Sequence, residues 1–172
     1  MGRAATKSIL AALLGAACVA AVVVAGGSAS ARDGMVNPVS EKVQVESRDG
    51  KVLVRLTIDN QSDRTVWVAR SVATEQELFG NWFEVRDSSN GDPLDYIGPT
   101  VKRAPLGKAD YVAVKPHSQL KNTIDITRAY AFMQGRHTYQ LNYAGSYLAD
   151  VKKIAQATPV EPDSAMFAHI VQ

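Results

Sequence analysis

The sequence predicts an all-β protein built as an antiparallel β-sandwich. Three observations predict this class. Apolar residues after position 31 alternate with polar residues at a period of two instead of 3.6. Turn-forming residues recur about every ten positions, and no long amphipathic helix pattern is present. This combination is typical of an immunoglobulin/fibronectin-like sandwich, here with about seven to nine strands that follow an N-terminal signal helix.

Residues 1–31 are predicted to be a signal peptide. Arg3 and Lys7 precede a continuous apolar run over residues 9–25. Ala29 and Ala31 then supply the small side chains that a signal peptidase requires. The run of 17 residues is at the lower limit for a membrane span, so an uncleaved anchor is the alternative. Cleavage after Ala31 predicts a secreted or periplasmic protein with no membrane association afterwards.

Removal of this segment changes the charge balance and the cysteine count. The chain has 19 Lys+Arg and 17 Asp+Glu, and the segment removes two cations and no acid, which leaves 17 of each. This balance predicts no nucleic-acid partner. The single cysteine, Cys18, leaves as well, so no disulfide or thiol chemistry follows. A lipoprotein attached at Cys18 is the alternative, which Gly15 disfavours because a lipobox usually has leucine there.

Residues 32–41 are predicted to be a flexible lead-in, and residues 42–172 a single domain. The clearest strand covers residues 51–59, where the alternate positions Val52, Val54, Leu56 and Ile58 are apolar. Asp49-Gly50 ahead of it favours a hairpin turn to a strand at 43–46, because these residues tolerate positive φ.

The remaining predicted strands are shorter and are separated by turn signals such as Asn90-Gly91. They cover residues 65–72, 82–86, 94–97, 111–114, 120–126, 137–143 and 165–171. Residues 128–133 are predicted to form a single helical turn, and residues 144–157 a loop or short helix. Five residues are expected to share one core between two sheets: Val54, Leu56, Ile124, Leu141 and Tyr143.

No pattern of a catalytic centre is found in the sequence, so we predict a non-catalytic protein with no metal and no cofactor. The three histidines, His117, His137 and His169, are 20 and 32 residues apart and lack the H-E-x-x-H spacing of zinc peptidases. A G-x-S-x-G nucleophile elbow is absent. Trp67 and Trp82 are interpreted as core residues, with stacking on a sugar or peptide as the alternative.

Two further features involve tyrosines and a long loop. Tyr139 is expected to tie a loop to a late strand, as a tyrosine often does in sandwich domains. Residues 98–110 contain two prolines, two glycines and three cations, which excludes regular structure throughout and is typical of a binding loop on a rigid scaffold. The candidate binding residues are Lys102, Arg103, Lys108 and Tyr96. The alternative is that Lys102 and Arg103 pair with Asp95 or Asp110 of their own domain.

Residues 43–143 resemble the immunoglobulin-like N-terminal domain of bacterial deuterolysin-type peptidyl-Lys metallopeptidases. The matching motifs are Thr57-Ile58-Asp59-Asn60, Glu77-Leu78-Phe79, Phe83-Glu84-Val85, Tyr96-Ile97-Gly98-Pro99, Val101-Lys102-Arg103-Ala104-Pro105, Asp110-Tyr111 and Gly135-x-x-x-Tyr139. The family's catalytic domain with its zinc helix is missing, so no catalytic residue carries over.

The resemblance implies an accessory or propeptide-like domain that acts on a secreted metallopeptidase. Such a domain serves as an inhibitor, a chaperone-like helper or a substrate-positioning module. The alternative is a cell-envelope adhesion or structural module that binds protein or glycan. In either case we expect a monomer that binds a protein partner.

Overall fold

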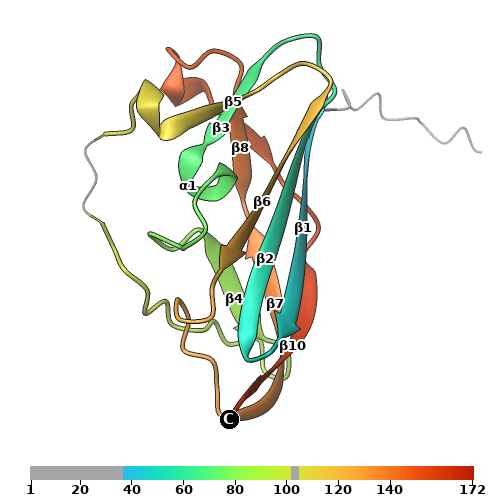
Figure 1. The fold of residues 1–172 in the computed structure, drawn as a ribbon, viewed down its shortest axis with the longest axis vertical. Coiled ribbons are helices and arrows are strands. Elements are labelled where there is room, and N and C mark those ends of the chain that lie inside the picture. The colour runs from blue at the N-terminus through green and yellow to red at the C-terminus, as the bar shows by residue number, and fades with distance from the viewer. Residues whose placement is uncertain (1–36, 102–104) are drawn as a thin grey trace, which may run out of the picture. The chain divides into compact units, whose positions relative to one another are not determined.

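The computed structural model describes residues 37–101 and 105–172 (Figure 1). The predicted signal peptide lies outside the described residues, as do candidate residues Lys102 and Arg103. Residues Val36–Gln172 form one compact unit. The described part has ten strands and three short helical segments, so the all-β prediction is confirmed, although the strands are more numerous than predicted.

The strands are β1 (Val39–Arg48), β2 (Lys51–Asn60), β3 (Val66–Ala69), β4 (Phe83–Asp87), β5 (Tyr111–Val114), β6 (Ser118–Asp125), β7 (Gly135–Tyr143), β8 (Gly145–Leu148), β9 (Thr158–Val160) and β10 (Ala165–Val171). The helical segments are the α-helical turn α1 (Arg70–Ala73) and two 3₁₀ turns, η1 (Lys108–Asp110) and η2 (Ile154–Gln156).

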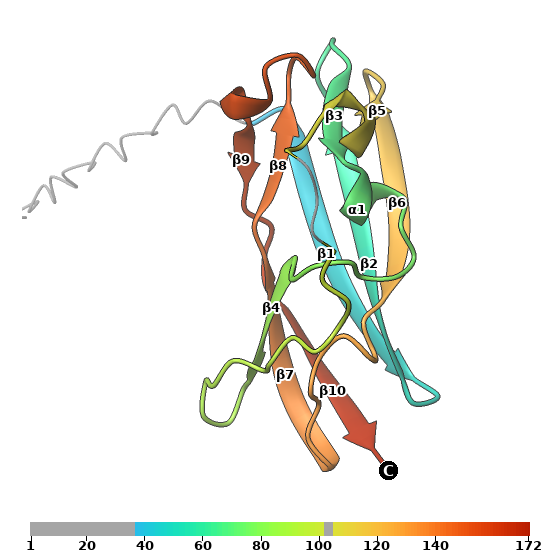
Figure 2. The same ribbon diagram turned by 90° about the vertical axis from the view of Figure 1, so that its left-hand side faces the viewer.

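The strands form three antiparallel sheets with the orders β1-β2-β6, β10-β7-β4 and β5-β3-β8-β9. Figure 2 shows β1, β2 and β6 on one side and β4, β7 and β10 on the other. A single residue, Ala144, separates β7 from β8, so the chain passes directly from the second sheet into the third. Buried side chains of all three sheets meet in one core.

The hairpin β1–β2 has the turn and register that the sequence predicts. Asp49 and Gly50 adopt φ values of 53° and 72°, and Arg48 pairs with Lys51 across the two-residue turn. Positive φ at both central positions matches the twist of the flanking strands. The five predicted core residues are all buried: Val54, Leu56, Ile124, Leu141 and Tyr143. The predicted alternation in β2 is therefore correct in register.

A buried asparagine explains the end of the Thr57-Ile58-Asp59-Asn60 motif. The side-chain amide of Asn60 donates to the carbonyls of Arg64, Val114 and Lys115 at 2.8–3.0 Å. Its oxygen accepts from the backbone N–H of Ser62 at 3.1 Å. One side chain therefore joins the end of β2 to the turn between β5 and β6.

Several short elements differ from the predictions. The strand expected over 65–72 ends at Ala69, where α1 begins and turns Val72 and Ala73 into the core. Residues 94–97 form only isolated bridges beside Pro93, which has no N–H to donate to a ladder. The helical turn expected over 128–133 is replaced by a turn in which Ala129 N–H bonds to Ile126 O.

Two boundaries were also missed. The segment expected to be a loop or short helix over 144–157 contains β8, whose Leu148 is 1% exposed. The first strand, β1, begins at Val39, so the last residues of the expected lead-in 32–41 belong to the sheet. Val39 is buried and pairs with Asn60, which places it in the domain core.

Candidate functional site

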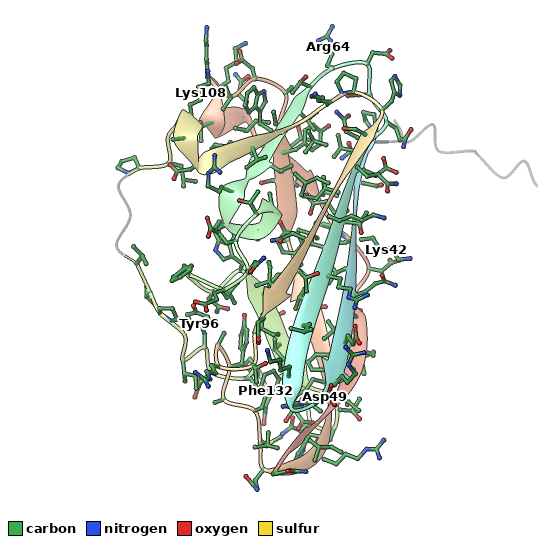
Figure 3. The ribbon with its side chains drawn as sticks, in the orientation of Figure 1. Lys42, Asp49, Arg64, Tyr96, Lys108 and Phe132 are labelled. Atoms are coloured by element: carbon green, nitrogen blue, oxygen red, sulfur yellow. The ribbon has the colours of Figure 1, made fainter. Side chains whose placement is uncertain are left out.

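The loop candidates are not brought together in the described part of the chain. Tyr96 and Lys108 lie on separate segments, at different levels of the domain (Figure 3). Lys108 is exposed in η1. Neighbouring Asp110 accepts a hydrogen bond from the backbone N–H of Gly107 at 2.8 Å, which caps that turn.

Tyr96 holds two loops together. Its hydroxyl oxygen accepts the backbone N–H of Gly80 at 2.9 Å and lies 2.9 Å from the carbonyl of Pro99. Its ring stands edge-on to that of Tyr130, with 5.5 Å between the ring centroids. A Cβ at Gly98 would lie 2.7 Å from the Tyr96 hydroxyl oxygen, so the Tyr-x-Gly motif has a structural cause.

Tyr139 has the loop-tying role that the sequence predicts. Its hydroxyl accepts the backbone N–H of Met133 at 3.1 Å, and its side chain is fully buried. Phe132, next to Met133, packs edge-to-face on Tyr139 with ring centroids 5.1 Å apart. The segment before β7 is thereby fixed against the core.

The described residues form a cleft of about 860 Å³. Its lining segments lie at the end of the domain that holds the C-terminus, which is marked in Figure 1. Three segments that are distant in sequence line it: the β1–β2 turn, residues 127–136 and the end of β10. Ile97 also lines it. In Figure 3 the labelled residues Phe132 and Asp49 lie at this end.

The cleft has an apolar wall with an aromatic base. Ile97 is 63% exposed and Ile170 is 50% exposed. Phe132, which lines the same cleft, is half-buried and contacts the rings of His169 and Phe167 edge-to-face, at 5.0 and 6.2 Å between centroids. Because these rings are packed on the core, the base of the cleft is preformed.

The polar groups of the cleft include a contact between the half-buried Ser47 and the buried His169. Ser47 Oγ lies 2.9 Å from His169 Nδ1, and burial lowers the pKa of His169. The imidazole is therefore neutral near pH 7 and the pair joins β1 to β10. No carboxylate among the described residues lies within ion-pair distance of His169.

The other charges of the cleft lie at its rim. Asp49 is 3.4 Å from the guanidinium of Arg48, and Arg136 is exposed. Across residues 37–101 and 105–172, no group of three His, Cys, Asp or Glu side chains is placed to hold a metal ion. In the same ranges, no helix has the length and apolar character needed to cross a membrane.

The two tryptophans have different environments. Trp82 packs against the core and its indole N–H points to Phe79 O at 3.4 Å, in agreement with the core interpretation. Trp67 is half-buried on the opposite face of β3 from the core residues Val66 and Val68, and it pairs with Leu148. The core interpretation is therefore wrong for Trp67.

Sequence reasoning missed the cleft, although a signal for it is present. In β10 the outward positions Met166, Ala168 and Ile170 are as apolar as the inward positions. A strand with one face in solvent is expected to alternate with polar residues there. The apolar outward positions therefore indicate that this face of β10 contacts something other than solvent.

Fold and site together define an antiparallel β-sandwich with an apolar cleft at one end. No protein-family model matches the chain, and no curated protein matches it. Among solved structures, a crystal structure of the periplasmic chaperone SfaE is similar, with 12% sequence identity and a TM-score of 0.37. The match covers 78% of this chain and 57% of the chaperone chain, so this protein spans little more than half the length of that chaperone.

Proposed function

We propose that this protein is an exported, non-catalytic protein-binding domain whose partner docks an apolar segment in the cleft beside Phe132. The observation that carries the proposal is the exposure of Ile97 and Ile170 on the walls of one cleft. Single exposed apolar residues are ordinary, but apolar residues gathered around a concave, aromatic base are typical of interaction sites.

The energetics favour a peptide segment as the occupant. Burying apolar surface contributes about 25 cal/mol per Å², so covering two large aliphatic side chains supplies a few kcal/mol. The base is held by Tyr139, Phe167 and His169, which lowers the entropy lost on docking. The rim charges Asp49 and Arg136 then supply polar contacts around an apolar centre, as in other protein interfaces.

The resemblance noted in the sequence supports a secreted metallopeptidase as the partner. In this proposal the domain acts as an accessory, inhibitor or chaperone-like module that has no catalytic domain of its own. The second candidate is a cell-envelope adhesion or structural module that binds protein or glycan. The outward position of Trp67 favours it, since a partly exposed indole ring can stack on a sugar.

A binding assay with matched variants tests the proposal. The purified protein is immobilised and exposed to arrays of apolar peptides, to a glycan array and to the metallopeptidase fraction of its own culture medium. Ile97→Asp is expected to weaken peptide or peptidase binding at least tenfold, because a charge in the cleft must be desolvated, a cost of about 1.4 kcal/mol or more.

Met166→Asp is the control. Met166 is also a large exposed apolar residue of β10, yet it does not line the cleft. Its variant is expected to bind as the parent does. Binding that survives Ile97→Asp, or that is lost equally in both variants, contradicts docking at the cleft. Glycan binding that depends on Trp67 establishes the second candidate instead.

A further inference from the structure

An acidic residue occupies a core position in the first strand. Side chains at alternate positions of β1 point inward, and Glu41 stands between the buried residues Val39 and Val43. Only 7% of its surface is exposed. Neither carboxylate oxygen has a hydrogen-bond partner among the described residues. Buried carboxylates in folded proteins are normally paired or hydrogen-bonded.

The space for this carboxyl group depends on a glycine. A Cβ placed on Gly145, the first residue of β8, would overlap the carboxylate of Glu41. The carboxyl group therefore lies directly against the β8 backbone. Gly145 is buried, so the first half of β1 and the start of β8 close on one another at this point.

The groups around Glu41 cannot neutralise a negative charge. Across the ladder, β2 contributes Ile58, and β9 contributes Val160 beside Gly145. The titratable neighbour on β7 is Tyr143, whose pKa is raised by burial and by the charge of Glu41. No Lys, Arg or His of the described chain lies within 4.0 Å of the Glu41 carboxylate.

The other charged and titratable groups on the neighbouring elements do not contact the Glu41 carboxylate. Lys42 follows Glu41 in β1 but points outward (Figure 3). On β10, the histidine that contacts β1 is His169, and it meets Ser47, six residues further along the strand. Six residues of strand extend about 20 Å. Glu161, after β9, is exposed and carries the same sign of charge.

Burial makes ionisation of Glu41 costly, and it raises the pKa of the side chain to about 7. An apolar side chain of similar volume has no charged form to desolvate at any pH. The carboxyl group therefore adds no packing that a methionine lacks, and it adds a dependence on pH.

We propose that Glu41 is a proton-operated latch: in its neutral form it allows the first half of β1 to pack against β7 and β8, and its ionisation loosens that half of the strand. The latch closes in acid and opens as the medium becomes neutral to alkaline. The second half of β1 is held separately, by the turn at Asp49-Gly50 and by the contact between Ser47 and His169.

The direction and the size of the pH effect on closure follow from proton linkage. In the open state Glu41 has its ordinary pKa of 4.5, and in the closed state its pKa is about 7. The closed state thus binds the proton more tightly, and closure is lost as pH rises from 4.5 through 7. A difference of this size changes the opening equilibrium on the order of a hundredfold, at ten per pKa unit.

Hydrogen exchange of the full chain at pH 5 and pH 8, corrected for the intrinsic exchange rates, tests the latch. Amides of Val39–Val43 and of β8 are expected to lose protection on the order of a hundredfold between the two pH values. Glu41→Gln and Glu41→Met are expected to keep their protection at both. The methionine variant keeps the test valid if the buried amide of glutamine prevents folding.

Glu161→Gln is the matched control, because it removes an exposed carboxylate and is expected to keep the full pH dependence. Protection of Val39–Val43 that does not change with pH in the parent protein overturns the proposal. A pH-dependent loss that persists in Glu41→Met also overturns it, because the proton must then act elsewhere.

Discussion

At the scale of single residues, Tyr96 shows that a distinctive sequence motif can have a structural role. Tyr96 belongs to the most distinctive stretch of the sequence, and it was expected to bind a partner. Its hydroxyl is occupied by the backbone N–H of Gly80 and by nearby carbonyls, including that of Pro99. The aromatic motif around it is therefore accounted for by loop geometry.

Tyr96→Phe separates a structural role from a binding role. Removing the hydroxyl leaves the ring contact with Tyr130 and deletes the hydrogen bonds, so the free energy of unfolding is expected to fall by about 1–2 kcal/mol. Urea denaturation measures this. Tyr111→Phe serves as the control and is expected to stay within about 0.5 kcal/mol, since the Tyr111 side chain is only half-buried.

The two variants also report on binding. If Tyr96→Phe binds the partner with unchanged affinity, the hydroxyl of Tyr96 has a purely structural role. Affinity that falls while stability stays at the parent value restores Tyr96 as a binding residue.

At the scale of elements, strand β2 is the central support of the sandwich. It pairs with β1 along its whole length and with β6 over eight positions. Its inward residues Val52, Val54, Leu56 and Ile58 are at most 1% exposed. Because side chains alternate, a shift by one residue would move all four into solvent. Register in this strand is thus strongly specified.

Leu56→Ala is expected to lower the free energy of unfolding by about 2–5 kcal/mol, the usual cost of emptying a buried leucine site. Chemical denaturation checks it. Arg55→Ala, one residue away on the opposite face, removes only an ion pair with Glu46 and is expected to cost less than about 1 kcal/mol. Equal effects in the two variants contradict the register of β2.

Long, strongly alternating strands could be predicted from sequence, whereas short ones could not. The ten-residue strand β2 carries enough apolar positions to define its period, and Asp49-Gly50 defines its turn. The four-residue strand β8 begins with glycine and is a strand because β3 and β9 supply its hydrogen bonds. Four residues are too few to show a strand pattern when the strand depends on pairing with distant segments.

The candidate site could not be predicted from the sequence for the same reason, because it depends on tertiary structure. Ile97, Phe132 and Ile170 are 35 and 38 residues apart, and only the fold brings them to one cleft. The charged loop, in contrast, was conspicuous because its residue types are unusual. Composition predicted an irregular segment over residues 98–110, but it did not predict which side chains the fold would gather.

At the scale of the whole molecule, pH dependence combines two buried acids of opposite behaviour. Hydrogen bonds from Ser89 and the nearby His137 lower the pKa of Asp87, so its contribution to stability is lost as pH falls below its ordinary value of 3.8. Burial raises the pKa of Glu41, so its contribution is lost as pH rises from 4.5 through 7. Stability is therefore expected to be greatest at about pH 4 to 5.

Thermal unfolding across this range checks the expectation. The parent protein is expected to melt at a higher temperature at pH 5 than at pH 8, with a difference in unfolding free energy of about 3 kcal/mol at most from Glu41. Glu41→Gln is expected to remove most of that difference. A melting temperature that is higher at pH 8 in the parent protein contradicts the assignment.

The contact between Glu41 and Gly145 has a consequence for how this sequence can diverge. The two positions compete for one volume, because any side chain at 145 occupies the space of the carboxylate. Alanine at 145 is therefore expected to require that the Glu41 carboxyl group moves or that position 41 carries a smaller side chain. A substitution that enlarges either side chain is therefore expected to be compensated at the other position.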